Sequence, residues 1–538
     1  MASWREAFAL SKSEVKERMP PGTVRILDQQ DDSSTSTDGR LVRSPKPSRS
    51  AKDPLNWPFW QKVAALLVAS VYAFVANFTS SVIAPVLQLW FVAYPQEPKS
   101  FSDLSYLIAV SSLLLGSSNI WWVPLSNWAG RRPVLLLATL LMTLCTVWCA
   151  VAKSFSSLLA ARILQAAGGG AADSVAPALI GDMYFVHERG RAMAVYTIFL
   201  SSGAITGGLC GGYLGYAHGW TNIFWVSTAL AGFVFLGVVF FVPETLFDRV
   251  AEDTSSLSGS GDAKEAGDAK EAGAKDVETV ETRAASPPEL QGSFTYLESL
   301  GLRRPRGSLV RFFVQPWRTL ALPGTWVVML HYAGLVGGIV TLSVIGPQIL
   351  SAPPYLWGEN AGLINVGGLI GTLVGYLYTF VLADSRLKRQ AKHQGHGLAE
   401  PESRLPIMFF PLFIATSGFF VFGFCSQYPG GSRWVGMEIG YGMISFGLTQ
   451  VPSVGFNYLI DAYQHLAADC FTMVTILRAI VAFAWSFFVA SWVEDRGAAE
   501  PFGIFGMLMG LFALLTVPLW LFGKRMRIAT SSLVLKQE

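Results

Sequence analysis

The stretch RRPVLLLATLLMTLCTVWCAVAK (residues 131–153) decides the fold. Uncharged, mostly apolar residues fill positions 133–152, and arginines and a lysine stand at the two ends. A run of about 20 such residues crosses the hydrocarbon core of a bilayer as one helix. The stretch therefore predicts a membrane-spanning helix.

The same pattern recurs along the chain in two sets of six. The apolar runs lie near 62–84, 104–125, 133–152, 156–180, 193–215, 222–242, 322–346, 360–383, 406–426, 434–460, 470–493 and 501–523. Only 14% of the 538 residues are charged, whereas soluble domains have about 25%. So many long runs exclude buried helices of a soluble protein. The sequence predicts an all-α membrane protein of twelve spans in two six-helix halves.

Polar segments separate and flank these sets. The halves are expected at 61–243 and 321–525, and the polar segments are an N-terminal tail (1–60), a central loop (244–320) and a C-terminal tail (526–538). The loop contains GDAKEAGDAKEAGAKD from Gly261, and the N-terminal tail contains DDSSTSTDGR. Such segments have almost nothing apolar to bury, so we predict that the loop and the N-terminal tail are disordered.

Basic residues fix the expected orientation, because the short loops that carry them stay in the cytosol. They gather on one side, in the loops after the second, fourth and eighth spans and after the last span. This bias places both termini and the central loop in the cytosol. An even number of spans requires both termini on one side of the membrane, which agrees with this placement.

Five local strings carry a resemblance to a known family. They are DPLNWP (53–58), HERGRAMAVY (187–196), VPET (242–245), EPESRLP (400–406) and YLIDAYQ (458–464). In this order, over roughly 53–245 and 320–527, the chain resembles the major facilitator superfamily, in particular fungal members of its twelve-span drug:proton antiporter family. The resemblance implies the major facilitator fold, with a substrate site between the halves. It also implies a plasma-membrane location, and we expect a monomer.

The loop VPLSNWAGRRP (123–133) resembles the family motif G-x-x-x-D-R-x-G-R-R, with Val123, Asn127 and Trp128 in place of the glycine, the aspartate and the first arginine. In the family that aspartate joins a charge network that stabilises one gate state, so the network is weakened here or moved. The string LADSRLKR after the eighth span offers a second version. The candidate gating residues are Asn127, Gly130, Arg131, Arg132, Asp384 and Arg386. The alternative is that the arginines only set topology.

The fourth span, ARILQAAGGGAADSVAPALIGD (161–182), places Arg162 and Asp173 inside one apolar helix. A charge within a span is costly unless it meets a partner or water. The two residues share a face but lie about 16 Å apart along the axis, so each needs its own partner. Arg162 and Gln165 resemble the family's R-x-x-Q-G motif, which implies that Arg162 takes part in proton coupling. Asp173 is the second coupling candidate, and purely structural roles are the alternative.

Two spans carry glycines at four-residue spacing, which lets helix backbones approach closely. These ladders are Gly203, Gly207, Gly211 and Gly215 in the fifth span, and Gly367, Gly371 and Gly375 in the eighth. In the family these two spans meet across the halves, which implies a rocking contact between the ladders. Tight packing alone is the alternative. The family's antiporter motif has a proline where this chain has Gly208, which weakens the antiporter assignment.

Other polar residues within spans are candidates for the substrate cavity. With Gln165 they are His331, Tyr332, Gln450, Asn457 and Arg478. Gln450 and Asn457 are seven residues apart and therefore share a face of the tenth span. His331 can titrate near neutral pH, although a lone histidine in a span more often makes a helix–helix hydrogen bond.

No enzyme signature is present: the chain has no Walker A string, no HExxH and no GxSxG. The cysteines lie in or beside apolar runs without a CxxC, so we expect neither a metal site nor a cofactor. A net charge of +3 gives no reason to expect nucleic acid. The expected partners are the lipid bilayer, a small molecule and protons.

The sequence thus predicts a secondary transporter that works by alternating access, with proton-coupled export of a drug, toxin or secondary metabolite. One alternative is a facilitator or importer of a nutrient such as a polyamine or organic acid. The other is a non-transporting membrane sensor.

Overall fold

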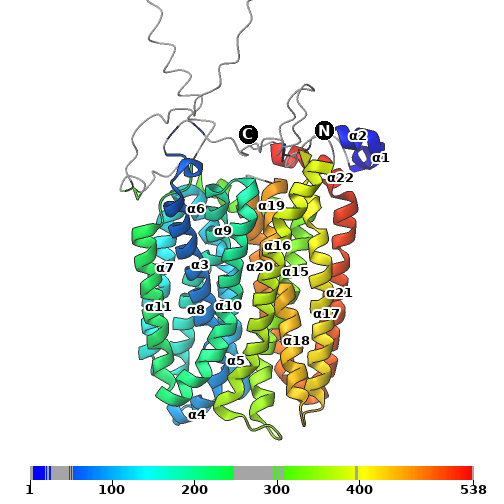
Figure 1. Cartoon of the computed structure of the whole chain (residues 1–538). Helices are drawn as coiled ribbons and strands as arrows, with labels where there is room; N and C mark the ends of the chain where they lie inside the picture. Colours follow the sequence, from blue (N-terminus) through cyan, green and yellow to red (C-terminus); the bar gives the residue numbers. More distant parts are fainter. Residues whose placement is uncertain are drawn as a thin grey trace, which may run out of the picture.

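The computed structural model is a bundle of long, roughly parallel helices, with both termini at the same end (Figure 1). It describes most of residues 4–20, 48–247 and 308–535, with gaps at 394–397 and 464–465, and a few short pieces elsewhere. The predicted disordered loop lies mostly outside the described residues, as does the N-terminal tail between 26 and 47, so both remain predictions. Ten helical stretches in the described parts are long and apolar enough to cross a membrane.

The first half contains the helices that follow the short turn η1 (Pro54–Asn56). They are α3 (Phe59–Ser81), η2 (Ala84–Leu89), α4 (Trp90–Ala93), α5 (Phe101–Ser117), α6 (Asn119–Ala129), α7 (Arg131–Val151), α8 (Phe155–Gly169), α9 (Ala171–Met183), α10 (Val186–His218) and α11 (Trp220–Phe241). The third predicted span is α7, with the two arginines at its first residues.

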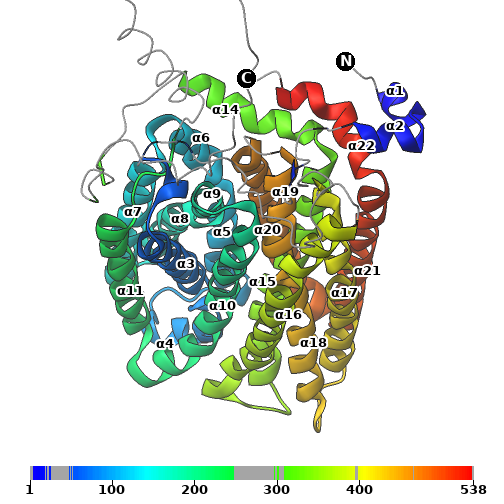
Figure 2. The same ribbon diagram turned by 45° about the horizontal axis from the view of Figure 1, so that its top comes forward.

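The second half follows α14 (Leu309–Arg318) and η3 (Thr319–Ala321). It contains α15 (Pro323–Ser351), η4 (Gly358–Ile364), α16 (Asn365–His393), η5 (Pro401–Arg404), α17 (Pro406–Gln427), α18 (Arg433–Leu448), η6 (Val451–Gly455), α19 (Phe456–Tyr463), α20 (Ala467–Arg496), α21 (Ala499–Leu514) and α22 (Thr516–Leu535). Figure 2 shows the two halves side by side, with the N-terminal half in blue to green and the C-terminal half in yellow-green to red.

The two predicted spans that are not among these ten stretches are both interrupted helices. The fourth span is α8 and α9, joined at Gly170, whose φ of −63° and ψ of −30° keep the chain in a helical direction. The tenth is α18 and α19, joined through the π-helical turn η6, which contains Pro452. Proline cannot donate a backbone hydrogen bond, so it disturbs the helix there. With these two, the predicted layout of six and six spans is confirmed.

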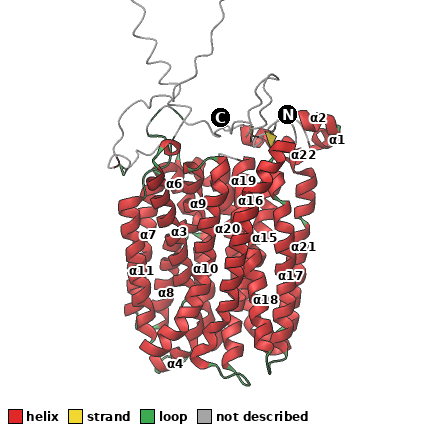
Figure 3. Cartoon of the chain, viewed as in Figure 1, coloured by secondary structure: helices red, strands yellow, loops and turns green. Residues whose placement is uncertain are grey.

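Short elements occupy the end of the bundle where the termini lie. α1 (Trp4–Ala9) and α2 (Lys12–Glu17) fall within the predicted N-terminal tail. α1 packs on α22, where Arg525 donates a 2.6 Å hydrogen bond to the Phe8 carbonyl. A two-residue pair, β1 (Val24–Arg25) with β2 (Leu398–Ala399), is antiparallel. Apart from such pieces the described chain is helical (Figure 3).

The two glycine ladders pack inside their own halves, which corrects the predicted rocking contact between them. A Cβ atom at Gly203 or Gly207 would collide with backbone carbonyl oxygens of α3, and one at Gly211 with that of Val82, the residue that follows α3. A Cβ atom at Gly367 or Gly371 would collide with backbone carbonyl oxygens of α18. Glycine spacing identifies a closely packed face of a helix, but it does not say which helix that face meets.

The contact between α10 and α16 comes from an adjoining face of α10. A Cβ atom at Gly208 would lie 2.8 Å from the Asn365 side chain, and one at Gly212 would lie 3.1 Å from the Glu359 carbonyl oxygen. On the other side of the molecule α5 packs against α20. The two halves are therefore in contact along two seams, one between α10 and α16 and the other between α5 and α20.

Candidate functional site

A cavity of about 60 Å³ lies between the two halves. Residues of α3, α5 and α10 line it from the first half, and residues of α15, α18 and α20 line it from the second. Its polar lining consists of Asn77, Ser80, Ser81, Ser112, Ser201, Tyr332, Ser343 and Arg478, and the rest is aliphatic. Sites for organic ligands have volumes of about 300–1,000 Å³. The cavity is too small for such a ligand, so the two halves are closed around the cavity in this conformation.

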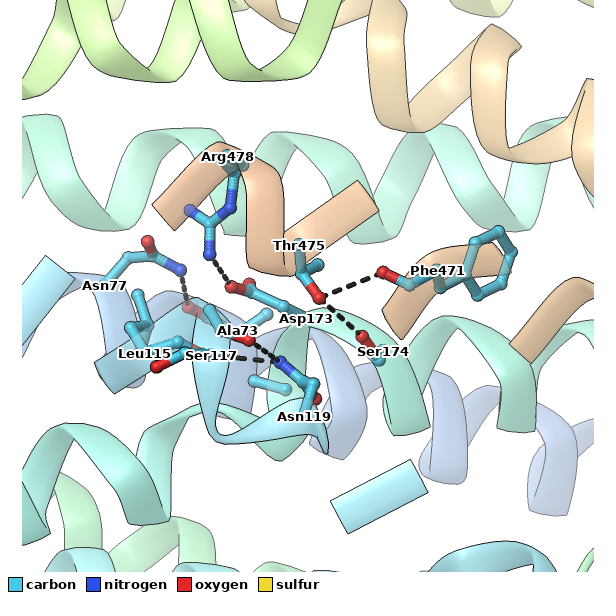
Figure 4. Close-up of polar contacts among 12 residues, drawn as sticks. Ala73, Asn77, Leu115, Ser117, Asn119, Asp173, Ser174, Phe471, Thr475 and Arg478 are labelled. Carbon is cyan, nitrogen blue, oxygen red and sulfur yellow. Dashed lines mark hydrogen bonds and ion pairs between the residues drawn. The ribbon is translucent and has the colours of Figure 1, made fainter. Parts of the chain in front are cut away.

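An ion pair joins the halves beside this cavity. Arg478 of α20 donates from Nη2 to the Asp173 carboxylate of α9, and the two side chains are only 5% and 1% exposed. Next to it the hydroxyls of Ser174 and Thr475 lie 3.3 Å apart, again one from each half. Figure 4 shows both contacts. A buried carboxylate and a buried guanidinium each need the other's charge, because neither is solvated there.

Glycines at the α8–α9 junction bring Asp173 to this place. A Cβ atom at Gly168 would lie 2.5 Å from the Met142 amide nitrogen, and one at Gly170 would collide with the Ser118 hydroxyl. Because Cβ is absent, this helix lies directly against α7 and against the junction between α5 and α6. The Gly168 carbonyl accepts a hydrogen bond from the Tyr72 hydroxyl at 2.5 Å. These contacts fix the register of α9, and Asp173 lies in its first turn.

Arg162 is held by neutral partners in the first half. Its guanidinium donates to the carbonyls of Thr79 at 2.5 Å and Ser80 at 2.6 Å, and to Gln165 Oε1 at 3.1 Å. Gln165 in turn donates to Thr146 at 2.9 Å. Arg162 and Asp173 therefore have separate partners, as their axial spacing predicts. Arg162 does not line the cavity itself, but Ser80, whose carbonyl it holds, does.

The gating loop around Gly130 is organised by a carboxylate that the sequence did not single out. Glu244 accepts hydrogen bonds from the backbone N–H groups of Arg131 (3.0 Å) and Arg132 (3.1 Å), at the first residues of α7. Negative charge is stabilised at such a helix N-terminus. Gly130 has φ +112°, and a Cβ atom there would collide with the Glu244 carboxylate.

Asn127 contributes one hydrogen-bond acceptor to the same loop. Its Oδ1 accepts a 2.8 Å hydrogen bond from Arg131, whose Nε also lies 3.5 Å from Asp182 at the end of α9. Asp182 therefore provides the negative charge that Asn127 lacks. An ion pair of Arg131 is therefore present in this loop, and whether it acts in gating stays a prediction.

A second charge cluster lies at the same end of the bundle and centres on Asp461, which the sequence did not single out. Asp461 of α19 is buried between Arg189 of α10 and Arg404 of η5. Glu402 makes a two-bond pair with Arg527, both bonds at 2.7 Å. The overlooked signal was the loop string YLIDAYQ, whose resemblance to the family was noted without a role for its aspartate.

The remaining candidate residues lie at different places. Tyr332 and Arg478 line the cavity, and the Arg478 guanidinium lies 5.3 Å from the Tyr332 ring centre. His331, Gln450 and Asn457 do not line it. His331 Nε2 lies 2.8 Å from the Phe512 carbonyl oxygen, so it packs against α21. Asp384 and Arg386 lie in α16, and their side chains lie outside the described residues.

Gln450 and Asn457 make hydrogen bonds within the second half. Gln450 Oε1 accepts from Thr379 at 3.0 Å, and Asn457 donates to the Ser453 carbonyl at 2.5 Å. Within the described residues no cluster of three metal-ligating side chains is found.

Two six-helix halves around a closed central cavity, joined by a buried ion pair, define a membrane transporter of the two-domain, alternating-access class. The sequence pattern of the Major Facilitator Superfamily matches residues 66–485. The chain belongs to that superfamily, whose members are transporters and not enzymes.

Relatives and solved structures agree with this assignment. An uncharacterized MFS-type transporter of Schizosaccharomyces pombe is 26% identical over 94% of this chain and 92% of its own. The efflux pump radE of Floropilus chiversii is 24% identical over 88% of this chain and 82% of its own. The proton:xylose symporter XylE of E. coli shares the fold, with a TM-score of 0.59 and 14% identity over 87% of this chain and 96% of that one.

Proposed function

We propose that this transporter exports a small organic molecule, such as a drug, toxin or secondary metabolite, across the plasma membrane. Export is coupled to inward movement of protons through alternating access, and both termini lie in the cytosol. The observation that carries the proposal is the buried Asp173–Arg478 ion pair, because it joins the two halves directly beside the cavity. Several relatives are named efflux pumps, which supports the outward direction.

Protonation of Asp173 links proton binding to movement of the halves. A proton neutralises the carboxylate and removes its attraction for Arg478, and this attraction is strong because the surroundings have a low dielectric constant. The inter-half contact at this level then consists of neutral hydrogen bonds such as Ser174–Thr475. A group that holds the halves together only when ionised makes the cavity easier to open when it is protonated.

Arginines at the end with the termini support the cytosolic orientation. Arg131, Arg189, Arg404 and Arg527 all lie at that end, in contact with carboxylates. The positive-inside rule assigns such an end to the cytosol.

Uptake of a nutrient such as a polyamine or organic acid is the second candidate, and Gly208 is the observation that favours it. The family's antiporter motif has proline at this position, and here the missing side chain makes room for Asn365 of the opposite half. The seam between α10 and α16 is therefore built differently from the one that the motif describes.

Proteoliposomes test the proposal. We expect counterflow of candidate substrates by the wild-type protein, and accumulation driven by an imposed proton gradient. Asp173→Asn should abolish gradient-driven accumulation, while Ser174→Ala, which removes the neighbouring uncharged contact, should largely retain it. Proton-independent transport by the wild type, together with unchanged transport by Asp173→Asn, would overturn proton coupling. The direction of gradient-driven flux decides between export and uptake, and absence of any flux would favour the sensor.

A further inference from the structure

The helix α14, LVRFFVQPWR, has three distinct faces. If each residue advances the helix by about 100°, Phe312, Pro316 and Leu309 fall on one arc, and these are its least exposed apolar residues. The adjoining arc carries Phe313, Trp317, Val310 and Val314, which are 37%, 52%, 71% and 48% exposed. The third arc carries Arg318, Arg311 and Gln315. The order around the helix is therefore protein-facing, exposed apolar, polar.

The location of α14 explains this order. It packs on α6 of the first half and on α20 of the second, and lies across the helix ends on the side of the termini (Figure 2). A helix at this level has protein on one side, bilayer on another and water on the third. Exposed apolar side chains at i, i+3, i+4 and i+7 with arginines beside them are typical of helices that lie in a membrane interface.

An apolar groove begins at the residues that follow α14. It has a volume of about 410 Å³, and the residues that line it are all apolar, including Leu320, Trp326, Leu519 and Met526. The Trp326 indole is 44% exposed and donates a 2.7 Å hydrogen bond to the Leu320 carbonyl. Tryptophans with one apolar side and one polar contact gather at membrane interfaces. The groove therefore adds a second apolar surface close to the C-terminal end of α14.

We propose that α14 is an interfacial helix that binds anionic phospholipid of the cytosolic leaflet. Its apolar arc lies among the upper acyl chains, Arg311 and Arg318 contact the phosphate groups, and the groove beside Trp326 takes part of an acyl chain. Arginine pairs well with phosphate, because its planar fork donates two parallel hydrogen bonds. The leaflet assignment rests on the orientation proposed above, whereas the burial of α14 in lipid does not depend on it.

Spin labels test the seating of the helix in liposomes of phosphatidylcholine and phosphatidylserine. In a version with the five native cysteines replaced by alanine, single cysteines at 313 and 317 report the apolar arc, and one at 311 reports the polar arc. We expect oxygen to relax the labels at 313 and 317 more strongly than a water-soluble nickel chelate does, and the reverse at 311. Equal nickel access at all three positions would overturn the inference, as would protection that requires an added soluble protein.

The lipid preference has its own test on the full-length protein. We expect phosphatidylserine in nanodiscs to raise the midpoint of thermal unfolding of the wild type by several degrees relative to phosphatidylcholine alone. The variant R311Q/R318Q should lose most of this rise, while K524Q, at a basic position on the same side outside α14, should keep it. A rise that R311Q/R318Q retains in full would overturn the assignment of the arginines to phosphate. Neither test measures transport, so each stands or falls separately from the transport proposal.

Discussion

Arg189 of α10 and Asp461 of α19 form an ion pair of 3.4 Å across the two halves, at the end where the termini lie. Asp461 also pairs at 3.0 Å with Arg404 of its own half. All three side chains are at most 7% exposed. One carboxylate therefore neutralises two buried arginines, and its bond to Arg189 has to break whenever the halves separate at this end.

Asp461→Asn should lower both transport and thermal stability, since it leaves two buried arginines without a counter-charge. Removing one partner of a buried ion pair costs about 3–5 kcal/mol. Arg189→Gln should be milder, because Asp461 keeps its pair with Arg404. Thermal unfolding in detergent and counterflow in liposomes measure the two effects. A larger stability loss for Arg189→Gln than for Asp461→Asn would contradict this view of the cluster.

Gly130→Ala should destabilise the first half more than Gly219→Ala does. Both glycines have positive φ angles, +112° and +87°, so a side chain at either position is strained by about 1–3 kcal/mol. At Gly219 an added Cβ meets nothing within 4 Å, whereas at Gly130 it collides with the Glu244 carboxylate. The difference in unfolding temperature between the two variants isolates the contact with Glu244. Equal losses would show that Glu244 moves aside without cost.

Gly208→Ala should slow transport by obstructing the seam between α10 and α16. The Asn365 side chain cannot simply move away, because it donates to the Gly362 carbonyl at 2.9 Å and accepts from the Tyr441 hydroxyl at 3.1 Å. That hydroxyl lies 3.2 Å from the cavity-lining Ser343. Initial rates of counterflow report the effect.

The double variant G208A/N365A is the control for steric conflict. Removing the Asn365 amide makes room for the added methyl group, so the rate should recover relative to Gly208→Ala alone. If the two losses add instead, as they do for independent sites, the seam is not limited by this contact.

The membrane spans could be predicted from the sequence, because the length of an apolar run can be read from one continuous segment of the chain. Each predicted apolar run corresponds to a helix or to an interrupted pair of helices, and the two runs outside the ten long stretches are interrupted at Gly170 and around Pro452. Prolines and glycines are weak break signals in membrane helices, since neighbouring helices satisfy the freed backbone groups. The break at Gly170 was therefore hidden in the sequence, whereas Pro452 is itself a visible sign of a weakened helix.

Contacts between segments far apart in the sequence could not be predicted in the same way. Asp173 and Arg478 were both chosen as candidates, but nothing in the sequence joins residues 305 positions apart. Asp461 follows an apolar run and was not selected as a candidate, yet the fold buries it between two arginines. The glycine ladders were recognised but assigned to the wrong partner helices. Which helix faces meet is decided by packing of the whole bundle, which periodicity in one helix does not report.

Arg162→Lys should abolish transport although it keeps the positive charge. The guanidinium reaches two carbonyls of α3, those of Thr79 and Ser80, and Gln165 of its own helix at the same time. An ammonium group is a compact point charge that does not reproduce this planar fork. Lysine would therefore leave at least one buried carbonyl unpaired, at a cost of about 1–3 kcal/mol.

The place of Arg162 gives this variant a specific signature. Ser80 and Ser81 line the cavity, so displacement of the end of α3 changes the substrate site as well as stability. We expect Arg162→Lys to weaken substrate binding in detergent, where no gradient exists, together with lost transport. Gln165→Leu leaves the bonds to Thr79 and Ser80 in place and should retain binding. If Arg162→Lys binds substrate normally and fails only in gradient-driven accumulation, Arg162 acts in proton coupling rather than in holding α3.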